Sequence, residues 1–291
     1  MRKLEKILDA LYSVQNLKKN LSYKLHRIPE LEKNARFKGA YAGKRCFVIG
    51  NGPSLKQQDL SLLADEYVFT VNQAARNESF KKMKPNFHFW ADENFFQIDE
   101  NKPEDMELLE KMKRVNEGNP DIQVFFPIQQ LGFSKKYGFE QTLNMNYFLS
   151  DVYMTANYNR EMDFTKNVPW YGTVVQWCII AAIYMGFSEI YILGCDNTSL
   201  MVTMKSSLHI NDDSDYAYNV TENEKKRMEY IVQKNGLEEY TQAYLETLKG
   251  YRKLYSYCSR RGIKLVNCSA QTVIDSIPRK KYEDVIAGGK K

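Results

Sequence analysis

The sequence predicts an α/β protein, with a mainly parallel sheet covered by helices on both faces and an amphipathic helix before it. Short apolar segments rich in β-branched and aromatic residues alternate with helical segments, which is typical of a parallel sheet. Glycine, asparagine and aspartate directly follow several of these segments, at the edge where open α/β sheets bind ligands. The 291 residues suffice for one large domain. We expect a basic helical extension over 1–40 and a single domain over 41–291, with a lid around 197–220.

The expected elements follow from apolar periodicity and turn residues. The expected strands are short and apolar, and they cover 45–49, 67–71, 86–90, 122–126, 189–193 and 263–267. The expected helices cover 104–117, 172–185 and 221–261, the last with a break at 235–236. A short helix or turn is expected over 54–63. Residues 128–170 show no clear periodicity, so no element is predicted there.

The N-terminal segment carries the whole net charge of the chain. Residues 1–27 hold seven basic and two acidic residues, a balance of +5, and the rest of the chain sums to zero. Apolar residues recur there at helical spacing, which predicts a basic amphipathic helix. Two interpretations stay open: a surface helix that touches anionic lipid, or a packing or oligomerisation helix with a solvated basic face. A homo-oligomer is expected, and nucleic-acid binding is not, because the body is neutral and lacks a nucleic-acid motif.

Composition excludes several classes of protein. Hydrophobic residues make up 43% and charged residues 26%, as in ordinary globular proteins. The longest apolar run, 177–187, is about 11 residues, whereas a membrane span needs about 20. With no recognisable signal peptide we expect a cytoplasmic protein, peripheral at the inner face of the membrane if residues 1–27 bind lipid. Five cysteines without C-x-x-C spacing and three histidines indicate reduced thiols and no zinc site.

The first motif is the run Gly50-Asn51-Gly52-Pro53-Ser54, which follows the first expected strand. Two glycines permit a sharp turn and a close approach to a ligand. Main-chain N–H groups there, with a helix start after them, would cradle a phosphate. The run is neither a Walker A loop nor a complete G-x-G-x-x-G. A plain strand–turn–helix junction is the alternative.

Further polar residues follow the other expected strands. Asn72 ends the second strand, and its amide suits the edge of a nucleobase or a ribose, with a loop-capping asparagine as the alternative. Asp92 ends the third strand. Gly172 and Thr173 open a helix whose N-terminus suits a second anionic group. Asp196 ends the strand 189–193 and is a candidate for catalysis or for binding a sugar hydroxyl, with a turn cap as the alternative.

A polar stretch over 209–216 lies where an active-site lid is expected. His209 is the candidate general base, because imidazole titrates near neutral pH. Asp213 and Asp215 form a D-x-D pair, which is a weak signal for a divalent metal, and a solvated loop is the favoured alternative. His88 lies in an aromatic strand and is expected in the core or at its rim.

The combination of GNGPSL after a strand, TVNQ about twenty residues later and MGFSEIYILGCD after a buried helix resembles two related groups of proteins. One is the bacterial CMP-sialic-acid-dependent sialyltransferases that build lipooligosaccharide. The other is the broader 6-hydroxymethylpterin pyrophosphokinase-like (MptE-like) family. The resemblance covers 44–73, 84–92 and 172–196, and the tail from GIKLVNCS onward. It implies a Rossmann-like sheet that binds a nucleotide at its carboxyl edge.

The resemblance also implies roles for particular residues. Asn51 and Gly52 match the loop that meets the nucleotide and its phosphate, and Asn72 matches the position that contacts base or ribose. Thr173 falls where the sialyltransferases place a small hydroxyl near the phosphate. Asp196 matches the aspartate before their acceptor-side loop. That loop carries tyrosines in the sialyltransferases, whereas here the accessory candidates Tyr216 and Tyr218 come later in the chain.

Three functions are therefore weighed. The first is an inverting glycosyltransferase that moves an acidic, sialic-acid-like sugar from a CMP-activated donor to a surface glycan or glycoprotein, with no obligatory metal. The second is a pyrophosphokinase that moves a diphosphate from ATP to a pterin-like alcohol and needs Mg²⁺. Its metal ligands would come from the acidic run at 212–215 or from Asp92 and Asp196. The third is a non-catalytic nucleotide-binding scaffold. The tail and the basic helix favour the first.

Overall fold

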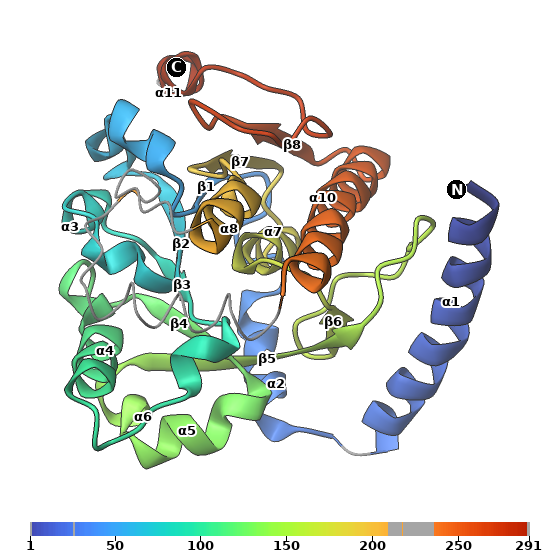
Figure 1. Cartoon of the computed structure of the whole chain (residues 1–291), viewed down its shortest axis with the longest axis horizontal. Coiled ribbons are helices and arrows are strands. Elements are labelled where there is room, and N and C mark those ends of the chain that lie inside the picture. Colours follow the sequence, from blue (N-terminus) through green and yellow to red (C-terminus); the bar gives the residue numbers. More distant parts are fainter. Residues whose placement is uncertain (1, 26, 209–216, 218–235, 290–291) are drawn as a thin grey trace.

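The computed structural model describes residues 2–25, 27–208, 217 and 236–289. The strands in this part of the chain form one sheet in the order β6-β5-β4-β3-β2-β1-β7-β8, and every neighbouring pair is parallel (Figure 1). Their bounds are β1 (Arg45–Ile49), β2 (Tyr67–Val71), β3 (Phe87–Phe89), β4 (Gln123–Pro127), β5 (Asn144–Val152), β6 (Asn167–Pro169), β7 (Glu189–Leu193) and β8 (Lys264–Asn267). The α/β fold class is thereby confirmed.

Helices cover both faces of the sheet. In Figure 1, α3 and α4 lie on one side of the strands, α7 and α10 lie on the other, and α1 stands outermost beyond them. The α-helices of the described residues are α1 (Arg2–Leu25), α2 (Pro29–Glu32), α3 (Phe80–Met83), α4 (Pro103–Lys113), α5 (Leu131–Lys136), α6 (Phe139–Thr142), α7 (Val174–Tyr184), α8 (Ser199–Ser207), α10 (Leu237–Arg260) and α11 (Tyr282–Gly288). Within the described residues, no helix has an apolar stretch long enough to span a bilayer.

The central strand β1 shows how the two faces are packed. Cys46 and Val48 point into a core shared with α7 and α10, whereas Phe47 and Ile49 point into the core on the opposite face, with α3, α4 and α11. Helix α7 is apolar all round and almost entirely buried, as expected for a helix enclosed between a sheet and another helix. The five cysteines are buried and free.

The predicted strands at 45–49, 67–71 and 189–193 are confirmed with the same bounds, and the others shift by a residue or two. The expected helix over 54–63 is two 3₁₀ turns, η2 (Pro53–Gln57) and η3 (Leu60–Leu63). Over 128–170, where the sequence predicts no element, the structure has α5, α6, β5 and β6. In β5, the consecutive residues 146–148 are all buried, so a half-buried strand's alternation is missing.

The strand order reverses at β1. From β1 the sheet continues through β2 to β6 on one side, and through β7 to β8 on the other. In a sheet of this kind, the crevice outside the carboxyl ends of the two strands that flank the reversal is the usual ligand site. Here those two strands are β1 and β7, which are followed by Gly50 and Gly194.

Candidate functional site

Two turns meet at the reversal point of the sheet, one after β1 and one after β7. The N–H of Gly50 donates to the Leu193 carbonyl and that of Gly52 to the Gly194 carbonyl, each at 2.8 Å. A Cβ added at Gly50 would lie within 3.0 Å of the Gly194 carbonyl oxygen, and one at Gly52 within 3.0 Å of the Asp196 carboxylate. Glycine is therefore required at both positions because the two turns touch.

Asp196 joins the two turns through its side chain. Its Oδ2 accepts the main-chain N–H of Ser54 at 2.8 Å, and its Oδ1 accepts the Ser54 hydroxyl at 2.5 Å. The carboxylate is 2% exposed. Burial raises the pKa of Asp196 above its ordinary value, and the two bonds from Ser54 act in the opposite direction. Asp196 therefore holds the first turn in place, a role that the sequence did not distinguish from catalysis.

Most of the N–H groups that the sequence suggested for a phosphate are used in this junction. Those of Gly50, Gly52, Ser54 and Leu55 all donate to oxygens of the protein, and Pro53 has none. A ligand phosphate at this edge must therefore be held mainly by side chains and by the N-terminus of α7.

Two asparagines continue the site along the sheet edge. Asn51 donates its Nδ2 to the Val71 carbonyl at 3.0 Å, which ties the end of β1 to the end of β2. Asn72 follows β2 in the left-handed region with φ of +46°, and its Oδ1 accepts the N–H of Ala91 at 3.4 Å. The Asn51 carbonyl accepts the N–H of Ala217 at 3.2 Å, so the predicted lid range meets the loop at this residue.

Asp92 lies farther along the same edge, after β3. Its Oδ1 accepts the N–H of Asn94 at 3.0 Å and the Asn94 side-chain Nδ2 at 2.8 Å, so it caps the 3₁₀ turn η5 (Glu93–Phe96). This cap gives Asp92 a structural role, independent of any ligand.

The N-terminus of α7 borders the junction from the other face of the sheet. Thr173 is its N-cap, and its side chain hydrogen-bonds the hydroxyl of Tyr251 on α10, which lies beside Cys195. A Cβ at Gly172 would lie within 3.0 Å of the Thr247 hydroxyl, so this glycine admits α10. Burial raises the pKa of Tyr251 well above its ordinary value, so this hydroxyl stays protonated at neutral pH.

Sequence reasoning missed the residues that support Cys195 and Asp196 from behind. The Ser269 hydroxyl accepts the N–H of Cys195 at 2.9 Å, and the Thr272 hydroxyl donates to the Cys195 carbonyl at 2.7 Å. The N–H of Val273 donates to the Asp196 carbonyl at 3.1 Å. The NCS triplet after β8 was the available signal, but nothing in its spacing pointed to the turn after β7.

Several predicted residues lie outside the described residues: His209, Asp213, Asp215, Tyr216 and Tyr218. Within the described ranges, no three His, Cys, Asp or Glu side chains gather in a way that could hold a metal ion.

A pocket of about 330 Å³ opens at the opposite edge of the sheet, beside the amino ends of β3, β4 and β5. Its amides are engaged in local main-chain bonds: Asn86 accepts the N–H of Val68 at 2.9 Å, and Asn119 donates to the Pro85 carbonyl at 3.1 Å. These lining side chains therefore hold the surrounding loops in place, and the junction of β1 and β7 remains the candidate site.

A solved structure of the sialyltransferase CstII from Campylobacter jejuni, in complex with the substrate analogue cytidine-5'-monophosphate, matches with 17% identity and a TM-score of 0.45. The match covers 82% of this chain and 85% of that one. No curated protein matches the sequence. The family described as 6-hydroxymethylpterin diphosphokinase MptE-like matches residues 13–199, well over half of the chain. The chain therefore belongs to the MptE-like family.

Proposed function

We propose that the chain is an inverting glycosyltransferase that binds a CMP-activated acidic sugar at the carboxyl ends of β1, β2 and β7. The acceptor is a hydroxyl of a surface glycan or glycoprotein. Its oxygen attacks the anomeric carbon, the bond from that carbon to the phosphate oxygen breaks, and CMP leaves. The acceptor proton goes to a general base, for which His209 is the candidate.

The observation that carries this proposal is the chemistry of the side chains at the junction. Asn51, Ser54, Asn72 and Thr173 carry no charge, and the Asp196 carboxylate is already bonded to Ser54. A CMP-sugar has a single phosphate with a single negative charge, which hydroxyls, amides and a helix N-terminus can hold. A triphosphate carries more charge, and its transfer reactions depend on metal ions to neutralise it. Neutral groups therefore suit the CMP-sugar better.

The family description favours a second candidate, a diphosphokinase that uses ATP and Mg²⁺. Both carboxylates at this edge are engaged by the protein, Asp196 by Ser54 and Asp92 by Asn94. For this reaction, the metal ligands would have to come from Asp212, Asp213 and Asp215, or Asp196 and Asp92 would have to exchange their partners.

Ligand-induced thermal stabilisation tests the two candidates directly. The wild-type protein is titrated with CMP and with ATP, each with and without Mg²⁺. A ligand at 100 times its Kd stabilises the fold by about 2.7 kcal/mol, which is several degrees in Tm. We expect CMP to stabilise the protein without Mg²⁺. Stabilisation only by the combination of ATP and Mg²⁺ would identify the diphosphokinase. If neither nucleotide shifts the Tm, the non-catalytic scaffold is the remaining function.

The Asn72→Gly variant tests whether the ligand binds at the junction. Glycine adopts the left-handed conformation of Asn72 without strain, so the variant removes the side chain and keeps the backbone. We expect CMP affinity to fall at least tenfold and the unliganded Tm to stay within a few degrees. Lys84→Gly is the matched control, because Lys84 also has a left-handed φ of +47° and is exposed away from this edge. Equal affinities in the two variants would contradict the assignment of Asn72.

A further inference from the structure

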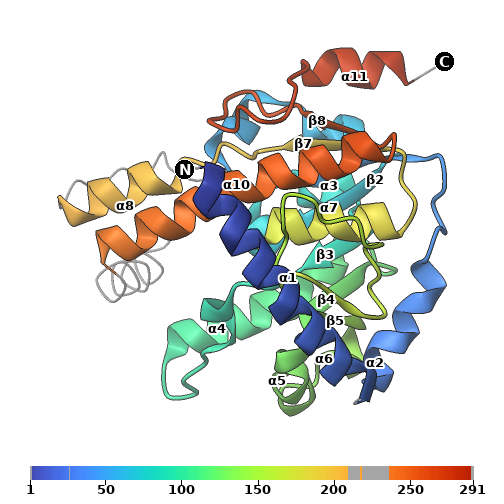
Figure 2. The same ribbon diagram turned by 90° about the vertical axis from the view of Figure 1, so that its right-hand side faces the viewer.

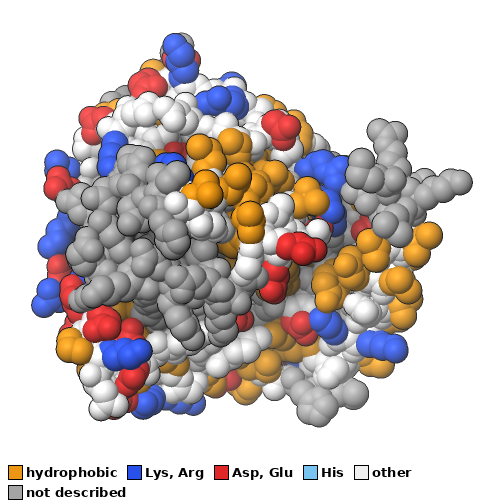
Figure 3. Space-filling model, viewed as in Figure 1, with side chains coloured by type: hydrophobic (Ala, Val, Ile, Leu, Met, Phe, Trp, Pro, Cys, Tyr) orange, Lys and Arg blue, Asp and Glu red, His pale blue; other side chains and the backbone are white. Residues whose placement is uncertain are grey.

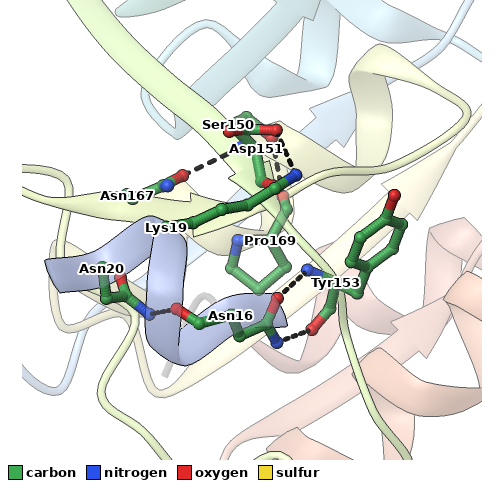
Figure 4. Close-up of polar contacts among 8 residues, drawn as sticks. All are labelled: Asn16, Lys19, Asn20, Ser150, Asp151, Tyr153, Asn167 and Pro169. Carbon is green, nitrogen blue, oxygen red and sulfur yellow. Dashed lines mark hydrogen bonds and ion pairs between the residues drawn. The ribbon is translucent and has the colours of Figure 1, made fainter. Parts of the chain in front are cut away.

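Helix α1 packs on the body through its polar side. Asn16 is 7% exposed, and both ends of its amide are used: Nδ2 donates to the Tyr153 carbonyl at 2.8 Å, and Oδ1 accepts the Tyr153 N–H at 2.7 Å (Figure 4). Lys19 reaches the carbonyl and the carboxylate of Asp151, both at 2.6 Å. The ring of Tyr12 stacks on that of Tyr153 with centroids 4.2 Å apart.

The main chain of residues 151–156, against which α1 packs, requires polar partners. Asp151 is an extra residue where the pairing of β5 with β6 shifts register, and its N–H donates to the side-chain Oδ1 of Asn167 in β6 rather than to a main-chain carbonyl. Main-chain groups beyond the bulge need hydrogen-bond partners when they are covered. The polar side of α1 supplies them, and Asp9 adds a bond to the N–H of Ala156 at 3.0 Å.

The apolar side of α1 is consequently turned away from the body. Its side chains are among the most exposed aliphatic groups of the described residues: Ile7 60%, Leu8 39%, Leu11 55%, Val14 57%, Leu17 61% and Leu21 58%. Figure 3 shows apolar atoms along α1 at the right of the molecule, and Figure 2, turned toward that side, shows the helix lying across the outside. A contiguous exposed apolar stripe of this kind marks an interaction surface.

We propose that the outward face of α1 binds the surface of an anionic lipid bilayer. The charges on this helix decide between that partner and a second copy of the chain. Lys18 is exposed and lies one turn from Val14 and from Leu21, within the apolar stripe. Over residues 7–23 the one acidic residue, Asp9, is bonded to the body, so the stripe has no carboxylate to pair with Lys18.

A second copy packed on this stripe would bury Lys18 without a partner, which is unfavourable. At a bilayer surface the same lysine extends to the lipid phosphates while its methylenes stay among the leucines. The net charge of +5 over residues 1–27 adds attraction to anionic lipid. The sequence left lipid binding and oligomerisation open, and the orientation of α1 favours lipid.

Co-sedimentation of the full-length protein with vesicles tests the proposal. One vesicle type is pure phosphatidylcholine, and the other is equimolar phosphatidylcholine and phosphatidylglycerol. We expect binding to the anionic vesicles that weakens with added salt. The double variant Leu11→Ser, Leu21→Ser should bind at least tenfold more weakly, and Lys18→Gln severalfold more weakly. The control Leu62→Ser, Val273→Ser alters two exposed aliphatic residues elsewhere, 41% and 47% exposed, and should bind like the wild type.

The altered α1 side chains are exposed, so these variants should keep the wild-type Tm and circular dichroism. Failure of the folded wild type to bind anionic vesicles would overturn the proposal, as would equal binding by the Leu11, Leu21 double variant. Light scattering on a sizing column measures the oligomeric state and so tests the alternative partner, a second copy of the chain. A wild-type dimer that the double variant converts to a monomer, with no vesicle binding, would assign the face to a second copy. The readout does not depend on the proposed transferase activity.

Discussion

The Ser54 side chain and main chain donate to the two separate oxygens of Asp196, which lies 142 residues later in the sequence. This pair of hydrogen bonds connects the turn after β1 to the turn after β7 at the point where the strand order reverses. The shape of the candidate nucleotide loop is thus set by a residue from the other half of the sheet.

Gly52→Ala should destabilise the protein. The added Cβ would lie within 3.0 Å of the Asp196 carboxylate and of the Gly194 carbonyl, so the two turns must separate. We expect the free energy of unfolding to fall by about 1–3 kcal/mol, measured by urea denaturation. Gly132→Ala is the matched control: it makes the same chemical change in α5, where a Cβ meets nothing within 4 Å. It should leave stability unchanged or slightly higher. Equal effects of both substitutions would contradict the tight contact.

Asp196→Asn should also destabilise the protein, because its NH₂ group would face one of the two Ser54 donors. The expected loss is about 1–3 kcal/mol near neutral pH. The pH dependence follows from the raised pKa of Asp196. A carboxyl whose pKa is higher in the folded state binds its proton more tightly there, so its contribution to stability falls as pH rises from its ordinary pKa through the folded value.

The stability difference, wild type minus Asp196→Asn, should therefore shrink as pH rises above about 4, the ordinary pKa of an aspartate. Chemical denaturation of both proteins at several pH values measures it. A difference that grows with pH over this range would mean that the hydrogen bonds from Ser54 outweigh burial.

His88 should make the protein sensitive to mild acid. It is fully buried, and burial lowers its pKa from 6.5 to about 3. The folded state thus keeps His88 neutral while the unfolded chain takes up a proton below 6.5. Its contribution to stability is complete above pH 6.5 and is lost as pH falls toward 3, at up to about 1.4 kcal/mol per pH unit.

In the His88→Gln variant, the pH-dependent contribution of His88 to the free energy of unfolding should disappear. Glutamine keeps a polar group near the Thr70 hydroxyl, which lies 2.8 Å from His88 Nδ1. We expect the variant to be less stable at pH 7 and to show a shallower loss of stability between pH 6.5 and 4, measured by urea denaturation. An unchanged slope would show that His88 is not the titrating group.

The strands that flank the candidate site could be predicted from the sequence, because parallel strands buried on both faces are continuous apolar runs. Arg45–Ile49, Tyr67–Val71 and Glu189–Leu193 are of this kind. Strand β5 was missed because it lies near the edge of the sheet, where Ser150 and Asp151 serve a bulge and a helix contact. Such roles depend on distant partners and leave no periodic signal.

The positions of the site residues could be predicted better than their roles. Asn51, Asn72 and Asp196 follow their strands at one edge, as expected. The engagement of Asp196 by Ser54, and the support of the second turn by Ser269 and Thr272, arise only in the folded chain. The amphipathicity of α1 was likewise visible in the sequence, but spacing alone does not tell which side meets the body. The main-chain groups at Tyr153 decide that.

The central position of β1 has a consequence for folding during synthesis on the ribosome. One neighbour of β1, β2, is made almost at once, but the other, β7, ends only at Leu193. At about 5–20 residues per second, the nascent chain waits on the order of ten seconds with one side of β1 unpaired. An apolar strand with an open edge is prone to pair with other chains. Strand β1, which lies inside the complete sheet, is therefore an open edge strand until β7 has been synthesised. A chaperone that binds this edge would protect the nascent chain from aggregation.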